Sequence, residues 1–207
     1  MIESAENAIQ LVLIFISTLM SFFWSGQNFK KAWALLGFSS FSFFLGDLYW
    51  QLYMFFYGET PVFCYISDIS WYASYLFLIL LMVEIGIRTD IGKRIKKLWP
   101  IPLFTLSAFF LYIQYGDIPG NVLNVILMTI LIWYASAGLL SIREKKTDKK
   151  YKFLLLLILA YAACEYASGI ISCFWMGDTI LNPYFWFDFL LGVVFILLPV
   201  SMRKAAK

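Results

Sequence analysis

Long apolar runs, separated by short polar segments, repeat along the whole chain. A helix that crosses a bilayer needs about 20 mainly apolar residues, and seven segments meet that requirement. They cover residues 8–24, 32–57, 63–87, 98–115, 120–142, 152–176 and 182–202. The runs are too long and too continuous for the alternating strands of a membrane barrel. We therefore expect an all-α integral membrane protein, with seven transmembrane helices in a single domain over residues 1–207.

Few charged residues remain to cover a water-facing surface. Of the 207 residues, 62% are hydrophobic and 14% are charged, whereas a soluble domain carries about 25% charged residues. The first residues, MIESAENAIQ, contain no basic region and no small-residue cleavage site, so we expect no cleaved signal peptide. The composition agrees with a chain embedded in a lipid bilayer.

Histidine is absent from the sequence, and cysteine is rare. Without an imidazole the chain has no histidine ligand for a metal or haem and no Ser-His triad. The three cysteines, Cys64, Cys164 and Cys173, match no zinc or haem spacing. A disulfide between Cys64 and Cys173 stays open, beside the commoner role of cysteines as small buried side chains. We expect no cofactor and no metal ion.

The basic residues predict the orientation in the membrane. All sixteen lysines and arginines fall in four groups: residues 30–31, 88–97, 143–152 and 203–207. With seven spans these groups share one side, while the opposite loops carry acidic residues and no basic ones. The positive-inside rule then places the N-terminus outside and the C-terminus inside a bacterial-type plasma (inner) membrane. We interpret the basic groups as a topology signal and a contact for anionic lipid, not as a nucleic-acid interface.

Two short segments look alike and suggest an internal duplication. FFYGET (55–60) follows one apolar run and FWMGDT (174–179) follows another, and an aromatic helix with an early Asp comes after each. The pattern favours a 3+1+3 arrangement, in which helices 1–3 and 5–7 are parallel repeats joined by the fourth helix. Turn chemistry alone produces the same letters, so this alternative stays open.

Polar side chains inside the apolar runs are the candidate ligand-binding residues. In chain order they are Asp47, Trp50, Gln51, Asp68, Trp71, Tyr72, Tyr75, Tyr161, Glu165 and Asp188. Helical spacing puts Asp47 and Gln51 on one stripe, and Tyr161 and Glu165 on another. Asp47 lies ten residues before the end of its run, about 15 Å from it at 1.5 Å per residue. Glu165 falls at a similar depth.

Two interpretations of these residues stay open. A charge at the centre of a spanning helix costs at least about 2.5–3.5 kcal/mol, and no lysine or arginine lies at this depth. The acids are therefore expected to face the bundle interior, protonated or hydrogen-bonded. They line an outward-opening polar and aromatic cavity, or they are contacts that hold helices together, worth about 0.6–2 kcal/mol per pair.

The eight tryptophans divide by predicted depth. Four are expected in the aromatic belts at the membrane interfaces: Trp24, Trp33, Trp99 and Trp175. The other four are expected deeper or facing the cavity: Trp50, Trp71, Trp133 and Trp186.

LGDLYW (45–50), followed after a short loop by ISDISWYASYLFLILLM (66–82), resembles the seven-helix N-terminal input regions of bacterial signalling proteins. Those regions precede diguanylate-cyclase (GGDEF) or histidine-kinase output domains. The matching positions are Gly46, Asp47, Trp50, Asp68, Trp71 and Tyr75. The resemblance implies a sensor. Because no output domain follows within the 207 residues, it also implies a separate signalling partner, which we expect in the cytoplasm or membrane at the basic inner loops.

The LGD segment is also similar to lysoplasmalogenase-type membrane hydrolases, whose two intramembrane acids activate water on a vinyl-ether lipid. Gly46 and Asp47 carry over, whereas the histidine-containing segment of that family is missing. If the chain is such an enzyme, Asp47 and Glu165 are the catalytic acid–base pair. A small-solute transporter is a third alternative. The sequence favours a sensor or binding module for a small, partly apolar ligand over an enzyme.

Overall fold

The computed structural model of the chain describes residues 2–25, 30–59, 65–87, 97–112, 118–144, 148–175, 177 and 179–206. Within these ranges the protein is helical and contains no β-strand. The seven α-helices are α1 (Ile2–Trp24), α2 (Lys30–Tyr57), α3 (Tyr65–Glu84), α5 (Pro100–Tyr112), α6 (Ile118–Arg143), α7 (Lys152–Ser172) and α8 (Pro183–Ala206), and the 3₁₀ turn η2 (Lys149–Tyr151) precedes α7. The prediction of an all-α fold is confirmed.

Five of the described helices are long and apolar enough to cross a membrane: α1, α3, α6, α7 with η2, and α8. Two others differ for physical reasons. α2 has 28 residues, but its serines, Asp47 and Gln51 interrupt the apolar run. α5 has 13 residues, or about 20 Å at 1.5 Å per residue. These five apolar helices support the prediction of a membrane protein.

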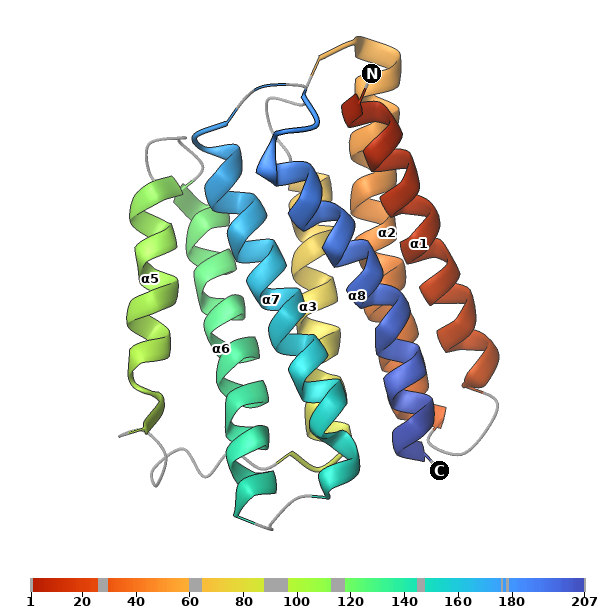
Figure 1. Cartoon of the computed structure of the whole chain (residues 1–207), viewed down its shortest axis with the longest axis vertical. Helices are drawn as coiled ribbons and strands as arrows, with labels where there is room; N and C mark the ends of the chain where they lie inside the picture. The colour runs from red at the N-terminus through yellow and green to blue at the C-terminus, as the bar shows by residue number, and fades with distance from the viewer. Residues whose placement is uncertain are drawn as a thin grey trace.

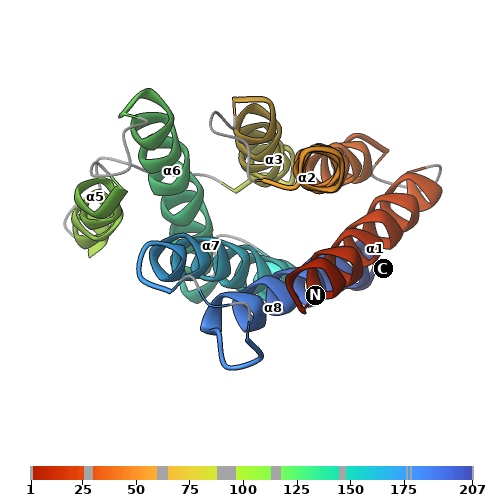
Figure 2. The same ribbon diagram turned by 90° about the horizontal axis from the view of Figure 1, so that it is seen from above.

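Six helices follow one another around a ring, and α5 lies outside it (Figures 1 and 2). α1 packs on α2, α2 on α3, α3 on α6, α6 on α7, and α7 on α8, while α8 returns to α1. α5 packs mainly on α6. Large apolar side chains such as Phe23, Phe55 and Leu103 are exposed on the outer faces, as expected where lipid surrounds the helices.

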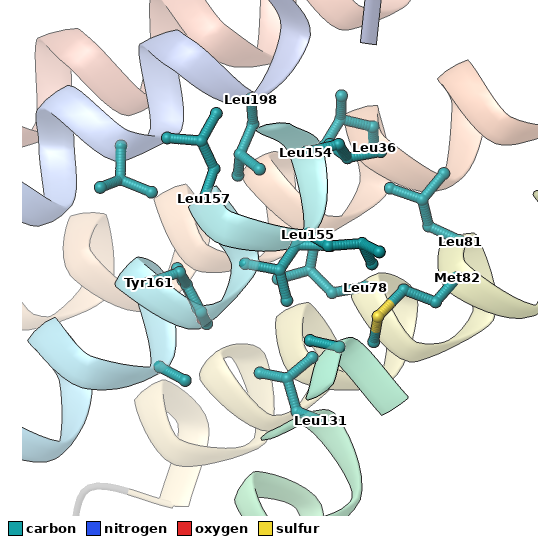
Figure 3. Close-up of a cluster of buried hydrophobic side chains, with 14 of the residues drawn as sticks. Leu36, Leu78, Leu81, Met82, Leu131, Leu154, Leu155, Leu157, Tyr161 and Leu198 are labelled. Carbon is teal, nitrogen blue, oxygen red and sulfur yellow. The ribbon is translucent and has the colours of Figure 1, made fainter. Parts of the chain in front are cut away.

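A cluster of leucines fills the ring toward the end where the C-terminus lies (Figures 1 and 3). It contains Leu36, Leu78, Leu81, Leu131, Leu154, Leu155 and Leu198, all fully buried. We call this cluster the leucine core. It joins α2, α3, α6, α7 and α8, so that helices from both halves of the chain share one apolar interior.

Aromatic side chains continue the interior beyond the leucine core. Phe43, Tyr75, Tyr161 and Phe195 are buried and pack ring against ring, and we call them the aromatic layer. The Phe43 and Phe195 ring centroids are 4.9 Å apart, and those of Tyr161 and Phe195 are 5.4 Å apart. Aromatic pairs at such distances add about 0.5–1.5 kcal/mol to the gain from burial.

Serines join neighbouring helices through hydrogen bonds. Ser17 of α1 donates to the Phe195 carbonyl at 2.7 Å and lies 3.2 Å from the Ser40 hydroxyl. The Ser39 and Ser74 hydroxyls are 3.0 Å apart. Small residues of this kind let helices approach closely while their hydroxyls remain paired. These serines are therefore packing contacts.

Several sequence expectations need correction. α1 begins at Ile2, six residues before the predicted start at residue 8. α3 ends at Glu84 because the chain then turns through Gly86, whose φ is +80°, a value that suits glycine. Trp33, expected in an interfacial belt, is a core side chain: it is 2% exposed and its ring centroid lies 5.3 Å from that of Trp24. Cys64 lies outside the described residues, so its pairing with Cys173 stays a prediction.

Candidate functional site

Three acidic side chains lie beyond the aromatic layer, toward the end of the bundle that holds the start of α1 (Figure 1). Asp47 follows Phe43 by one turn on α2, and Glu165 follows Tyr161 by one turn on α7. Asp188 lies near the start of α8. Asp47 and Asp188 are 8% and 6% exposed. Electrostatic interactions link the three carboxyl groups, so the structure brings these predicted residues together.

Gly46 explains how Asp47 obtains its hydrogen-bond donor. A Cβ atom added at Gly46 would lie 2.7 Å from Trp71 Nε1 and 3.1 Å from the Ser67 carbonyl oxygen. Only glycine therefore admits the indole at this point. Trp71 Nε1 donates to Asp47 Oδ1 at 2.8 Å, and the ring of Trp50 lies 6.2 Å from that of Trp71. The Gly-Asp pair thus fixes a tryptophan of α3 against α2.

The second acid, Glu165, accepts a hydrogen bond from a tyrosine of α3. The Tyr75 hydroxyl donates to Glu165 Oε2 at 2.5 Å and joins α3 to α7. The Tyr161 hydroxyl lies 3.4 Å from Ser74 Oγ, and the ring of Tyr161 packs edge-on against that of Tyr75 at 5.7 Å. Glu165 is therefore held by the aromatic layer on its side toward the leucine core and by its hydrogen bond to α3.

The third acid is held by residues of α1 and α8. The side chains of Gln10 and Tyr184 interact with the Asp188 carboxyl group. Gln10 Nε2 also lies 3.5 Å from the Asp188 carbonyl oxygen. Asn182 caps the start of α8, since its Oδ1 accepts from the Tyr184 backbone N–H at 3.0 Å.

Glu6, Gln10 and Tyr184 were not identified from the sequence. Glu6 interacts electrostatically with Asp47, and it lies before the apolar span that the sequence predicts from residue 8. Tyr184 lies within electrostatic range of all four carboxyl groups. Its position four residues before Asp188 is the signal that predicts the contact. We call Glu6, Asp47, Glu165 and Asp188 the acidic cluster.

Other predicted residues lie elsewhere or contact other helices. The Tyr72 hydroxyl donates to the Gly120 carbonyl of α6 at 2.8 Å. Asp68 is half-buried in the first turn of α3, and its role in ligand binding stays a prediction. Trp186, expected to be deep, is 55% exposed and donates to the Ile180 carbonyl at 2.9 Å.

No basic side chain in the described part of the chain reaches the acidic cluster. Lys31 precedes Asp47 by sixteen residues on α2, and Arg203 follows Asp188 by fifteen on α8. At 1.5 Å per residue these separations are about 24 Å and about 22 Å. The described lysines and arginines lie at the opposite end of the bundle. Asp47, Glu165 and Asp188 therefore have no lysine or arginine partner among the described residues.

Polar atoms beside the acids lack hydrogen-bond partners among the described residues. They are Asp47 Oδ2, Gln51 Nε2, Ser67 Oγ and Ser168 Oγ, and all four atoms are buried. A buried polar atom left without a partner costs about 1–3 kcal/mol. Each of these residues shares a helix face with a member or donor of the acidic cluster, because Gln51 follows Asp47, Ser67 precedes Trp71 and Ser168 follows Glu165 by about one turn.

The donor set limits the chemistry that the site can perform. Within the described ranges, no three His, Cys, Asp or Glu side chains are placed to hold a metal ion. The arrangement instead offers carboxyl oxygens, hydroxyls and an amide, with aromatic rings beside them. Such groups donate and accept hydrogen bonds and offer apolar ring surface.

Comparisons with known proteins give no family assignment. The chain matches no protein-family model, and it has no significant match among curated proteins or among solved structures.

Proposed function

We propose that the chain is a multi-pass membrane sensor or binding module that holds a small, partly apolar ligand at the acidic cluster. The observation that carries the proposal is the set of buried, unpartnered polar atoms beside acids that lack a basic partner in the described chain. A structure that used Asp47 only for packing would satisfy both carboxyl oxygens. Here Trp71 occupies Oδ1 and leaves Oδ2 for a ligand.

The proposal includes seven membrane spans with the N-terminus outside. α2 carries exposed large apolar residues along its length, among them Phe38, Leu45, Leu52 and Phe55, which favours lipid contact from end to end. The described basic residues lie at the end of the bundle opposite the acidic cluster. The positive-inside rule then gives the cluster access from outside a plasma membrane.

The helix order supports a 3+1+3 duplication. In the ring, α1 and α8 lie side by side and run in the same direction, as do α3 and α6 (Figures 1 and 2). A two-fold axis along the membrane normal relates such pairs when α1–α3 and α6–α8 are repeats. Asp47 on α2 then corresponds to Glu165 on α7, and α5 is the connecting helix.

Ligand binding would act through α3. Its Trp71 and Tyr75 donate to Asp47 on α2 and to Glu165 on α7, so a ligand that competes for either acid weakens one contact of α3. A ligand that prefers one of two helix packings shifts the population toward it. In the sequence, residues 88–97 follow shortly after α3, and this basic segment is where we place a signalling partner.

Mass spectrometry of small molecules that copurify with the protein tests this proposal. We expect the wild-type chain in mild detergent to retain a small molecule that Asp47→Asn loses. Tyr166→Phe is the matched control, because it removes a hydrogen bond of α7 to Ser107 of α5, outside the acidic cluster, and it should retain the molecule. Hydrolysis of a vinyl-ether lysolipid by the wild type, but not by Asp47→Asn, would replace the binding module with the hydrolase alternative.

A further inference from the structure

A proline interrupts the backbone hydrogen bonds of the last helix. Pro199 lies inside α8 and is buried. Proline has no backbone N–H, so it cannot donate to the carbonyl four residues earlier in a helix. That carbonyl belongs to Phe195, which is fully buried. The Phe195 carbonyl therefore needs a donor from outside its own helix, because buried backbone oxygens are normally paired.

A serine of α1 supplies the missing donor. Ser17 Oγ donates to the Phe195 carbonyl oxygen at 2.7 Å, and Ser17 is 0% exposed. In membrane proteins, serine side chains are among the groups that satisfy the backbone atoms freed by a proline. The bond thus replaces, from another helix, a contact that the backbone of α8 cannot make.

The Ser17 hydroxyl has a second acceptor within reach. Ser40 Oγ of α2 lies 3.2 Å from Ser17 Oγ, and either oxygen can donate to the other. Because a serine hydroxyl carries one proton, Ser17 donates either to Phe195 or to Ser40. When Ser17 donates to Ser40, the Phe195 carbonyl loses its donor from α1. The contact between α1 and α8 therefore has two discrete arrangements.

Pro199 divides α8 into two segments, and α1 contacts both of them. Before the proline, Gly192 lets α1 approach closely, since a Cβ added there would lie 2.9 Å from Leu13 Cδ1. After the proline, Arg203 Cζ lies 4.9 Å from the centroid of the Trp24 ring of α1. Sharp bends in helices occur most often at proline. α1 is therefore placed to hold the two segments of α8 in their present alignment.

We propose that Pro199 is a hinge of α8 and that Ser17 is its latch. While Ser17 donates to the Phe195 carbonyl, the hinge is closed. Transfer of this hydrogen bond to Ser40 releases the latch, and the two segments of α8 then bend relative to each other at Pro199. The acidic cluster and the basic end of α8 lie on opposite sides of the hinge, so the motion links the two ends of the bundle. The hinge requires no ligand and is independent of the proposed function.

A double-mutant cycle of thermal unfolding in detergent tests the latch. Ser17→Ala should lower the melting temperature by at least about 2 °C, because the Phe195 carbonyl loses its donor. In Pro199→Ala the helix regains an N–H for that carbonyl, so adding Ser17→Ala should then lower the melting temperature by less than half as much. Ser21→Ala is the matched control, since this serine is equally buried and its hydroxyl donates to the Ser17 carbonyl of its own helix at 2.9 Å. Its effect should be the same with and without Pro199→Ala.

Distances between spin labels, measured by pulsed electron paramagnetic resonance, test the bending. The labels are attached at Phe189→Cys and Lys204→Cys, two exposed positions of α8 on either side of the proline, in a chain with alanine at its three native cysteine positions. The two positions are about 22 Å apart along the helix axis at 1.5 Å per residue. Ser17→Ala should broaden the distance distribution toward shorter values, and adding Pro199→Ala should make it narrow again.

The outcomes separate the latch from the hinge. Additive effects of Ser17→Ala and Pro199→Ala on the melting temperature would overturn the latch. A coupled cycle in which Ser17→Ala leaves the distance distribution unchanged would overturn the hinge. If Ser17→Ala does not fold, its recovery by Pro199→Ala supports the latch, and the lack of recovery overturns it. In that case the wild type should show a broader distance distribution than Pro199→Ala, and equal distributions would overturn the hinge.

Discussion

The leucine core and the acidic cluster share helices α2, α7 and α8 but treat their polar groups differently. In the leucine core the side chains are fully buried and apolar, and the serines next to it have hydrogen-bond partners on neighbouring helices. In the acidic cluster, carboxyl groups accept from aromatic donors while nearby polar atoms have no partner in the described chain. The first region holds the helices together, whereas the second, in the function that we propose, keeps binding capacity at a cost in stability.

Replacing Gly46 or Gly37 of α2 with alanine should give the largest difference in ligand retention between the two regions. A Cβ at Gly46 meets the Trp71 indole at 2.7 Å, and a Cβ at Gly37 meets the Phe22 ring at 2.8 Å. Overpacking of this kind costs about 1–3 kcal/mol, so both alanine variants should melt at lower temperature in detergent. Only Gly46→Ala should also abolish retention of the copurified ligand, because it displaces the donor of Asp47. Equal loss of the ligand in Gly37→Ala would contradict the division into two regions.

Removing the hydroxyl of Tyr75 or of Tyr72, both on α3, should give a smaller difference, measured as binding affinity. Tyr75→Phe leaves Glu165 without its donor, which costs about 1–3 kcal/mol because a buried acceptor loses its partner. Tyr72→Phe removes a bond to a backbone carbonyl of α6, worth about 0.5–1.5 kcal/mol. Binding affinity for the ligand, measured by calorimetry, should fall in Tyr75→Phe alone. A fall of the same size in both variants would assign Tyr75 to packing.

Two serine substitutions should differ in their effect on the melting temperature. Ser168→Ala removes a buried hydroxyl without a described partner, so we expect a melting temperature equal to the wild type or higher. Ser39→Ala removes a hydroxyl paired with Ser74, and the loss is about 0.6 kcal/mol. Thermal unfolding monitored by circular dichroism distinguishes them. A lower melting temperature for Ser168→Ala would show that its hydroxyl has a packing role.

The length of the apolar runs predicted the seven helices, because hydrophobic continuity over about 20 residues depends on the sequence alone. Asp47, Glu165 and Asp188 could also be identified from the sequence, because they are acidic residues in apolar runs that contain no lysine or arginine. The helix α1 begins before the predicted apolar span, since MIESAE is polar but still compatible with a helix.

The partners of the acids could not be predicted, because they depend on the rotation of each helix about its axis and on contacts between distant segments. Gln10 and Asp188 are 178 residues apart, and Tyr75 and Glu165 are 90 residues apart. Trp33 and Trp186 were placed by depth, which does not tell whether a side chain points inward or outward. Hence one is buried and the other exposed, against expectation.

The thermal stability of Asp47→Asn, measured in detergent without added ligand, tests most directly whether the acidic cluster is built for binding. Asparagine keeps an acceptor for Trp71 and removes a charge from an uncompensated group. A buried carboxylate without a counter-charge is costly, so its replacement by a neutral side chain of the same shape should not destabilise the fold. Our account predicts a melting temperature equal to the wild type or higher, with loss of the copurified ligand. A melting temperature lower than that of Ser39→Ala, with ligand retention unchanged, would show that Asp47 is a packing contact and would contradict the account.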